Sequence, residues 1–172
     1  MNGLKHQTLE SAFGLIIDLY GPLSLRRNDM RLLGNSRILA RFSALQANRP
    51  AHRGRLGIKG DSAYPWLLDL SSYYKASKEG QPLTERQKHE NRVLKVIRES
   101  IEWNYGSTAA MFKYLVNLEK LKIMKGTNTT KVYIVASILR NCHTILYGCQ
   151  TSNFFNLSKE NFPTLQQYLR QE

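Results

Sequence analysis

A short apolar run at residues 13–20, followed directly by Gly21-Pro22, is the feature that most restricts how this chain can fold. An apolar run of this length next to turn residues is typical of a buried strand. Residues 4–9 predict a second, weaker strand, and the two strands would form a hairpin through residues 10–12. The N-terminal part of the chain is therefore expected to contribute to a sheet.

Helical patterns follow the predicted hairpin. Residues 29–48 predict a short helical turn and then a longer helix, separated by Gly34-Asn35-Ser36. Thr84 is expected to cap a long helix, because Gln87 three residues later completes a capping box. The apolar stripe predicted for this helix begins at four-residue spacing and then continues: Val93, Ile97, Ile101, Tyr105, Thr108, Met111 and Phe112.

A last clear helix is predicted to begin at a Thr130 cap. Its apolar side chains would share one broad face, made of Val132, Val135, Leu139, Cys142 and Leu146 and widened by Ile134, Ile138 and Ile145. A helix with so wide an apolar face is expected to be largely buried. Residues 113–124 fit either a helix end or a strand, and residues 162–165 predict the start of a final short helix.

The chain of 172 residues is long enough for one domain with a core of its own and short for two. It contains no internal repeat and no linker-like segment. The expected architecture is therefore a single α/β domain over residues 1–172.

Basic residues strongly outnumber acidic ones. The 25 Lys and Arg against 13 Asp and Glu give a net charge of +12. Residues 26–59 alone hold nine basic residues and one acid, Asp29. Such an excess favours a nucleic-acid partner, since neutralised phosphates release counterions. The alternative is that the charge serves solubility only.

Targeting features are absent from the sequence. The N-terminus does not read as a signal peptide, and no apolar stretch approaches the roughly 20 residues that a membrane span needs. Cys142 and Cys149 fit neither a disulfide framework nor a zinc motif, so we expect reduced thiols. These features predict an intracellular, nuclear protein that does not bind membranes.

Three acids are candidate metal ligands, because Mg²⁺ and similar ions prefer carboxylate oxygens. Asp61 follows a short predicted strand at residues 56–59, Glu102 lies within the long helix, and Asp29 lies in the basic stretch. Each has a structural alternative. Asp61 fits a turn residue, Glu102 fits an ion pair with Arg98, and Asp29 fits a helix N-cap.

Four motifs resemble, in order, those of Harbinger-like transposases of the DDE superfamily. They are the strand at residues 14–22 leading to Arg-Arg-Asn-Asp at 26–29, Gly-Asp-x-x-Tyr-Pro at 60–65, Arg-x-x-x-Glu at 98–102, and the segment 139–152. The resemblance implies an RNase H-like fold, a mixed sheet flanked by helices. It also implies a divalent-metal-dependent endonuclease that cuts transposon ends and joins them to target DNA.

The resemblance assigns roles to individual residues. It implies that Asp61 and Glu102 are catalytic, and that both bind Mg²⁺ or Mn²⁺ together with Asp29. The residues expected to contact DNA come from the resemblance and from the basic stretch: Arg26, Arg27, Arg53, Arg55 and Arg98. Since the sequence shows no helix-turn-helix or zinc module, sequence-specific binding would need a separate DNA-binding partner protein.

The sequence departs from the family pattern in three places. Asn28 and Leu25 stand where the family has His and Gly. The family's first catalytic aspartate lies in an Asp-Gly segment before the part that residues 1–7 resemble, and no such segment is present. We therefore expect a domain that lacks its first strand and has impaired activity. The alternatives are a non-catalytic DNA- or protein-binding module and a decayed transposase fragment.

Overall fold

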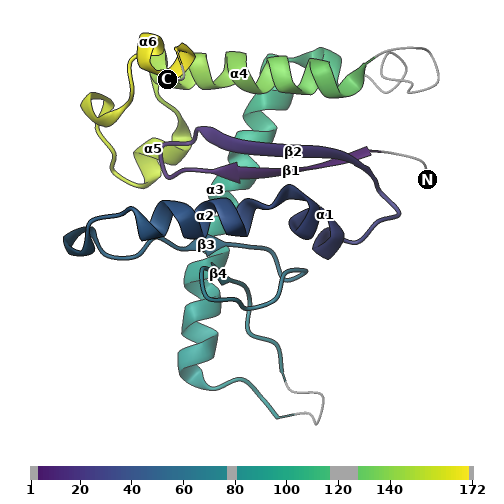
Figure 1. Cartoon of the computed structure of the whole chain (residues 1–172), viewed down its shortest axis with the longest axis vertical. Helices are drawn as coiled ribbons and strands as arrows, with labels where there is room; N and C mark the ends of the chain where they lie inside the picture. The colour runs from purple at the N-terminus through teal and green to yellow at the C-terminus, as the bar shows by residue number, and fades with distance from the viewer. Residues whose placement is uncertain (1–3, 77–80, 117–127, 171–172) are drawn as a thin grey trace. The chain divides into compact units, whose positions relative to one another are not determined.

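The computed structural model describes residues 4–76, 81–116 and 128–170, and it is a mixed α/β structure. Two small two-stranded sheets are formed in it, one by β1 (Leu4–Glu10) and β2 (Ile16–Ser24) and one by β3 (Ile58–Lys59) and β4 (Leu70–Ser71). The chain divides into two compact units, residues 1–5 with 23–99 and residues 6–22 with 100–172. The long helix α3 (Glu85–Met111) contributes its first half to the first unit and its second half to the second (Figure 1).

The predicted hairpin is confirmed with shifted bounds. The amide of Ser11 donates to the carbonyl of Leu15 at 2.9 Å, which closes the loop between β1 and β2. Gly14 lies in this loop with a φ of +74°, and a Cβ atom there would overlap with Sγ of Cys149. The expectation that Gly21-Pro22 ends the strand is wrong, because β2 continues to Ser24. Proline is compatible with a strand where its missing N–H is not needed for pairing.

In the first unit, α1 (Asp29–Ser36) and α2 (Ile38–Ala47) confirm the predicted pair of helices. The helices are separated at Arg37, whose left-handed φ of 53° follows the predicted break. The N-cap of α1 is Asn28, whose Oδ1 accepts from the amide of Arg31 at 3.0 Å. The N-cap alternative for Asp29 is therefore wrong, and Asp29 is the first residue of the helix.

The strands β3 and β4 are parallel, with Ile58 opposite Leu70. The predicted strand at residues 56–59 is thus present, although only its last two residues pair. The amide of Gly60 donates to the carbonyl of Ser71 at 2.8 Å, which extends the contact by one residue. Asp61 follows immediately where the chain leaves β3.

The capping box at the start of α3 is confirmed. The amide of Gln87 donates to Thr84 Oγ1 at 3.2 Å, and Gln87 Oε1 accepts from the amide of Thr84 at 3.0 Å. The part of the predicted stripe at four-residue spacing, in contrast, is not the buried face, since Val93 and Tyr105 are exposed and Ile97 and Ile101 are only half-buried. A four-residue repeat drifts around a helix of 3.6 residues per turn. The described α3 residues that are buried are Leu94, Ser100, Asn104 and Thr108.

Helix α4 (Thr129–Tyr147) is present, but two predictions about it are wrong. Its N-cap is Asn128 rather than Thr130, because Asn128 Oδ1 accepts from the amide of Lys131 at 3.1 Å. Its predicted apolar face is open, with Val135 54% and Leu139 51% exposed. The buried side of α4 is instead mostly polar: Ala136, Ser137, Arg140, Asn141, Thr144 and Ile145.

Hydrogen bonds to the hairpin explain why the polar side of α4 is the buried one. Arg140 Nη1 donates to the carbonyl of Gly14 at 2.6 Å. Asn141 bonds both backbone groups of Ile16, accepting from its amide at 2.9 Å and donating to its carbonyl at 2.8 Å. Burying these polar groups is favourable only because their partners are present.

The remaining described elements are short. The ambiguous segment begins with the 3-10 helix η2 (Lys113–Val116), and residues 117–124 of it lie outside the described residues. After α4, the chain forms α5 (Gln150–Phe154), η4 (Lys159–Asn161) and α6 (Leu165–Leu169). The 3-10 helix η1 (Ala51–Arg53) lies in the first unit, after α2. The predicted final helix is thus confirmed, and Cys142 and Cys149 are free thiols. Of the helices in the described ranges, none has the length and apolar character needed to cross a membrane.

Candidate functional site

Asp61 is held in a tight turn after β3. Its carbonyl accepts from the amide of Tyr64 at 2.9 Å and from Ser72 Oγ at 2.7 Å, and its Oδ1 accepts from the amide of Ser62. The turn-residue alternative is thus correct for its backbone and for one carboxylate oxygen. The side chain is nevertheless 40% exposed, so that solvent and a ligand can reach it.

Arg98, in the first half of α3, donates from Nη1 to Oδ1 of Asp61. The alternative in which Glu102 forms an ion pair with Arg98 is therefore not what the structure shows, since the described ion pair of Arg98 is with Asp61. One oxygen of the Asp61 carboxylate therefore receives both the Ser62 amide and a guanidinium.

Asp29 has a similar arrangement at the start of α1. Lys5 Nζ donates to Oδ1 of Asp29 at 2.7 Å, and the carboxylate is 41% exposed. A negative side chain in the first turn of a helix is also favoured by the helix dipole. Asp29 and Asp61 thus each have a cationic neighbour within the first unit.

Glu102 lies in the half of α3 that belongs to the second unit. Its side chain is exposed, whereas the flanking Ile101 and Trp103 are half-buried. The first unit therefore supplies two of the predicted acids and the second unit supplies the third.

The donor chemistry of these acids suits a hard divalent cation, because carboxylate oxygens are its preferred ligands. Within residues 4–76, 81–116 and 128–170, however, no three His, Cys, Asp or Glu side chains are grouped so that they could hold a metal ion. Lys5 and Arg98 occupy oxygens of Asp29 and Asp61. A metal ion bound at Asp29 or Asp61 would therefore have to compete with these two cations of the chain.

The five predicted DNA contacts fall into two groups. Arg26, Arg27 and Arg53 are exposed in the segments that precede α1 and follow α2. Arg98 is paired with Asp61, and Arg55 donates to Oδ1 of Asp69 at 2.5 Å. Because the Asp69 side chain is only 7% exposed, Arg55 also neutralises a buried charge. Arg27 and Arg53 are therefore the better sources of contacts to a polyanion.

The sequence patterns missed a polar cluster in the second unit. Arg140, 1% exposed, donates to the Asn104 side chain, which in turn donates to Glu10 Oε2. Burial raises the pKa of Glu10 to about 7, although the Asn104 hydrogen bond and the Arg140 charge lower it. The available signal was a charged residue in the middle of an otherwise apolar helix, since such a residue is seldom buried without partners.

Comparison with known proteins identifies the family. A family model described as DDE superfamily endonuclease matches residues 1–141, the segment that contains Asp29, Asp61 and Glu102. No curated protein and no solved structure matches the chain. Since the family model covers most of the sequence, this chain belongs to the DDE superfamily endonucleases.

Proposed function

We propose that this chain is a Harbinger-like transposase nuclease domain that cleaves DNA with a divalent metal ion, with Asp61 and Glu102 as catalytic acids. The observation that carries the proposal is the family match over residues 1–141. Enzymes of this superfamily generally depend on divalent metal ions, and a nuclease family implies a DNA substrate. The ordered motifs around the three acids support the finer Harbinger-like assignment and an RNase H-like arrangement of the domain.

The charge of the chain supports DNA as the substrate. A net charge of +12 favours binding to a phosphate backbone through counterion release. Arg26, Arg27 and Arg53 supply exposed guanidinium groups, which bind phosphate oxygens well. A member of a nuclease family with this charge is thus suited to bind DNA over many phosphates.

The ion pairs of the candidate ligands support weak rather than strong metal binding. Each carboxylate that is bonded to Lys5 or Arg98 must exchange that partner for a metal ion. The two carboxylates are 41% and 40% exposed, so a metal ion from solvent can reach both and compete with the paired cation. We therefore propose impaired activity, with metal ions needed at concentrations well above those of a preformed site.

The test is calorimetric titration of Mn²⁺ into the full chain, with cleavage of end-labelled duplex DNA in Mg²⁺ measured in parallel. We expect Asp61→Ala and Glu102→Ala each to weaken Mn²⁺ binding severalfold and to abolish cleavage. Glu85→Ala is the matched control, because Glu85 is an exposed acid of the same helix that pairs with Lys88. Equal Mn²⁺ affinities in all four proteins would refute the metal-site assignment.

A second candidate function is a non-catalytic DNA- or protein-binding module. The observation that favours it is that Asp29 and Asp61 are already neutralised by cations of the chain itself. In that case DNA binding would be retained in Asp61→Ala, and no Mg²⁺-dependent product would form with any variant. A cleavage product that forms with the unmodified chain and disappears in Asp61→Ala would favour the nuclease over the non-catalytic module.

A further inference from the structure

Helix α4 exposes apolar side chains in a regular pattern. Val132, Val135, Leu139, Cys142 and Leu146 follow one another at alternating spacings of three and four residues. This is the spacing of positions a and d in a coiled coil, where one helix packs along another. In the described part of the second unit this side of α4 is open, with Val135 54%, Leu139 51% and Leu146 42% exposed.

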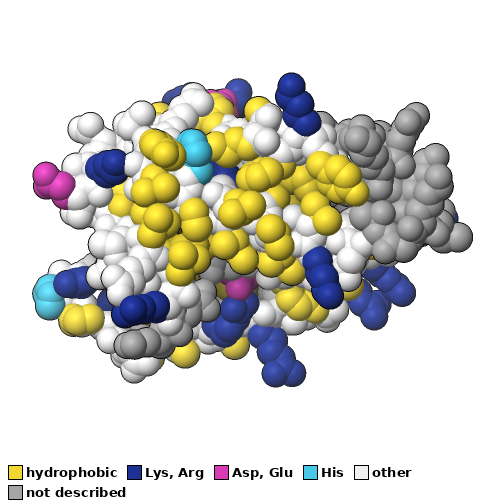
Figure 2. All heavy atoms as spheres, turned by 90° about the horizontal axis from the view of Figure 1, so that it is seen from above, with side chains coloured by type: hydrophobic (Ala, Val, Ile, Leu, Met, Phe, Trp, Pro, Cys, Tyr) yellow, Lys and Arg dark blue, Asp and Glu magenta, His cyan; other side chains and the backbone are white. Residues whose placement is uncertain are grey.

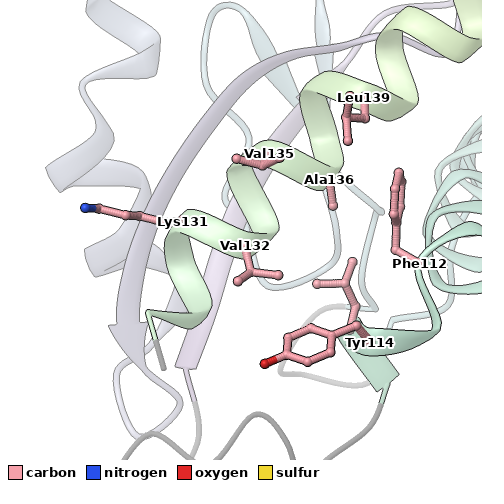
Figure 3. Close-up of a pocket in the computed structure, with 8 residues that line it drawn as sticks. Phe112, Tyr114, Lys131, Val132, Val135, Ala136 and Leu139 are labelled. Atoms are coloured by element: carbon pink, nitrogen blue, oxygen red, sulfur yellow. The ribbon is translucent and has the colours of Figure 1, made fainter. Parts of the chain in front are cut away.

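The open side of α4 continues into a groove. Val132, Val135, Ala136 and Leu139 form one wall, and the opposite wall comes from Phe112 with Tyr114 and Leu115 of η2. Figure 3 shows Val132 and Ala136 facing Phe112 and Tyr114 across the opening. The groove encloses about 320 Å³ and is lined almost entirely by apolar side chains. Figure 2 shows apolar side chains gathered over the face on which α4 lies.

This surface has the form of a helix-binding groove. In helix-in-groove recognition an amphipathic helix lays its apolar anchors into an apolar groove, and the two walls described above form such a groove. An apolar stripe that continues to Leu146 is longer than a small ligand of this volume would need. The buried polar side of α4, fixed by Arg140 and Asn141, prevents the helix from turning its apolar side inward.

Charge determines which helix fits. Lys131 lines the groove next to Val132 and takes position g, a position whose charge selects the partner in coiled coils. A second copy of this chain also has a net charge of +12, so that repulsion between the two copies opposes self-pairing. An acidic residue opposite Lys131 would instead form an ion pair at the rim.

We propose that the groove between α4 and η2 is the docking site for an amphipathic helix of a second protein, with acidic residues flanking its apolar stripe. The apolar stripe of the partner packs against Val135 and Leu139, and a partner Glu or Asp pairs with Lys131. None of the acids assigned to DNA cleavage lines the groove, so variants of the groove residues test docking without replacing a catalytic acid.

The experiment uses the full chain and fluorescein-labelled peptides of about 21 residues, which is three heptads. The acidic peptide carries Leu and Val at positions a and d and Glu at e and g. The basic peptide has Lys in place of each Glu, and a third peptide has the acidic composition in scrambled order. We expect the acidic peptide to bind at least tenfold more tightly than either of the others by fluorescence anisotropy in about 0.15 M salt.

Variants locate the binding surface. Leu139→Asp should weaken acidic-peptide binding at least tenfold, whereas Leu68→Asp, at an exposed position of the first unit, should leave it unchanged. Lys131→Glu should weaken the acidic peptide and strengthen the basic one. Because a misfolded protein would not gain affinity for the basic peptide, this exchange separates docking from loss of structure.

Two results would overturn the proposal. The first is equal binding of the acidic and scrambled peptides, or unchanged binding in Leu139→Asp, which would reduce the effect to general charge attraction. The second is a dimer of the chain that Leu139→Asp dissociates while the acidic peptide fails to bind. That result would show that a second copy covers this face of α4.

Discussion

Arg98 of α3 forms an ion pair with the carboxylate of Asp61, the residue that follows β3. The guanidinium and a metal ion would compete for the same carboxylate. We therefore expect Arg98→Gln to raise the affinity of the full chain for Mn²⁺ severalfold, as measured by calorimetry. Arg86→Gln is the matched control, because Arg86 pairs with Glu90 on the same helix. Weaker Mn²⁺ binding in Arg98→Gln would mean that Arg98 supports the metal site and does not compete with it.

The basic segments should bind DNA mainly through charge. We expect Arg53→Glu to lower duplex affinity severalfold and to reduce the slope of log K against log salt by about 1 or more. Arg55→Glu is a less clean test, because it also leaves the buried Asp69 without its cation. It should lower the melting temperature as well, whereas Arg53→Glu should not. Unchanged DNA affinity in Arg53→Glu would indicate that the basic stretch serves solubility only.

Gly14 is predicted to be the least replaceable glycine among those in the described ranges. Gly14→Ala should destabilise the chain by about 1–3 kcal/mol, because the residue has a positive φ and its Cβ would overlap with Cys149 Sγ. Gly106→Ala is the control within α3, where a Cβ meets no atom within 4 Å. It should stabilise the chain by about 0.5–1 kcal/mol. Chemical denaturation measures both, and equal effects would contradict the close packing at Gly14.

Glu10 should make stability depend on pH. Its pKa is about 7 in the folded chain because burial disfavours the charged form, against 4.5 for the free carboxyl group. Between these values the folded state keeps a proton that the unfolded state has lost. The contribution of the protonated Glu10 side chain to the stability of the folded chain is therefore fully present below about pH 4.5, and it is lost as the pH rises through 7.

Replacing Glu10 by Gln tests this dependence. Glu10→Gln keeps an oxygen that can accept from Asn104 and cannot ionise. At about pH 8 the variant should be more stable than the wild type by on the order of 2 kcal/mol, and at about pH 4 the difference should vanish. Thermal melts across this range measure the effect. A difference that does not change with pH would rule out Glu10 as the titrating group.

Local signals in the sequence predicted the local structure well. The capping box of Thr84 and Gln87 formed, and the strand before Asp61 formed, because these features depend on residues a few positions apart. The N-cap of α4 was misplaced by two residues, since both Asn128 and Thr130 have suitable side chains. The identity of the cap depends on backbone geometry that the residue types do not specify.

The burial of α4 could not be predicted in the same way. Periodicity located the apolar stripe but not the side that packs, which is determined by the partners of Arg140 and Asn141 in the distant hairpin. The ion pairs at the candidate site could not be predicted for the same reason. The acids Asp29 and Asp61 were found from their motifs, whereas their pairing with Lys5 and Arg98 depends on long-range contacts.

The open face of α4 also affects how the protein behaves in the laboratory. Exposed apolar surface favours aggregation, and mutual repulsion between highly charged molecules opposes it. Salt shortens the range of that repulsion from roughly 10 Å at 0.1 M to roughly 3 Å at 1 M. A high-salt wash that removes nucleic acid from the protein would therefore also allow the molecules to associate through Val135 and Leu139. A chain purified in this way should stay dispersed only if the wash is brief or if the groove is already filled.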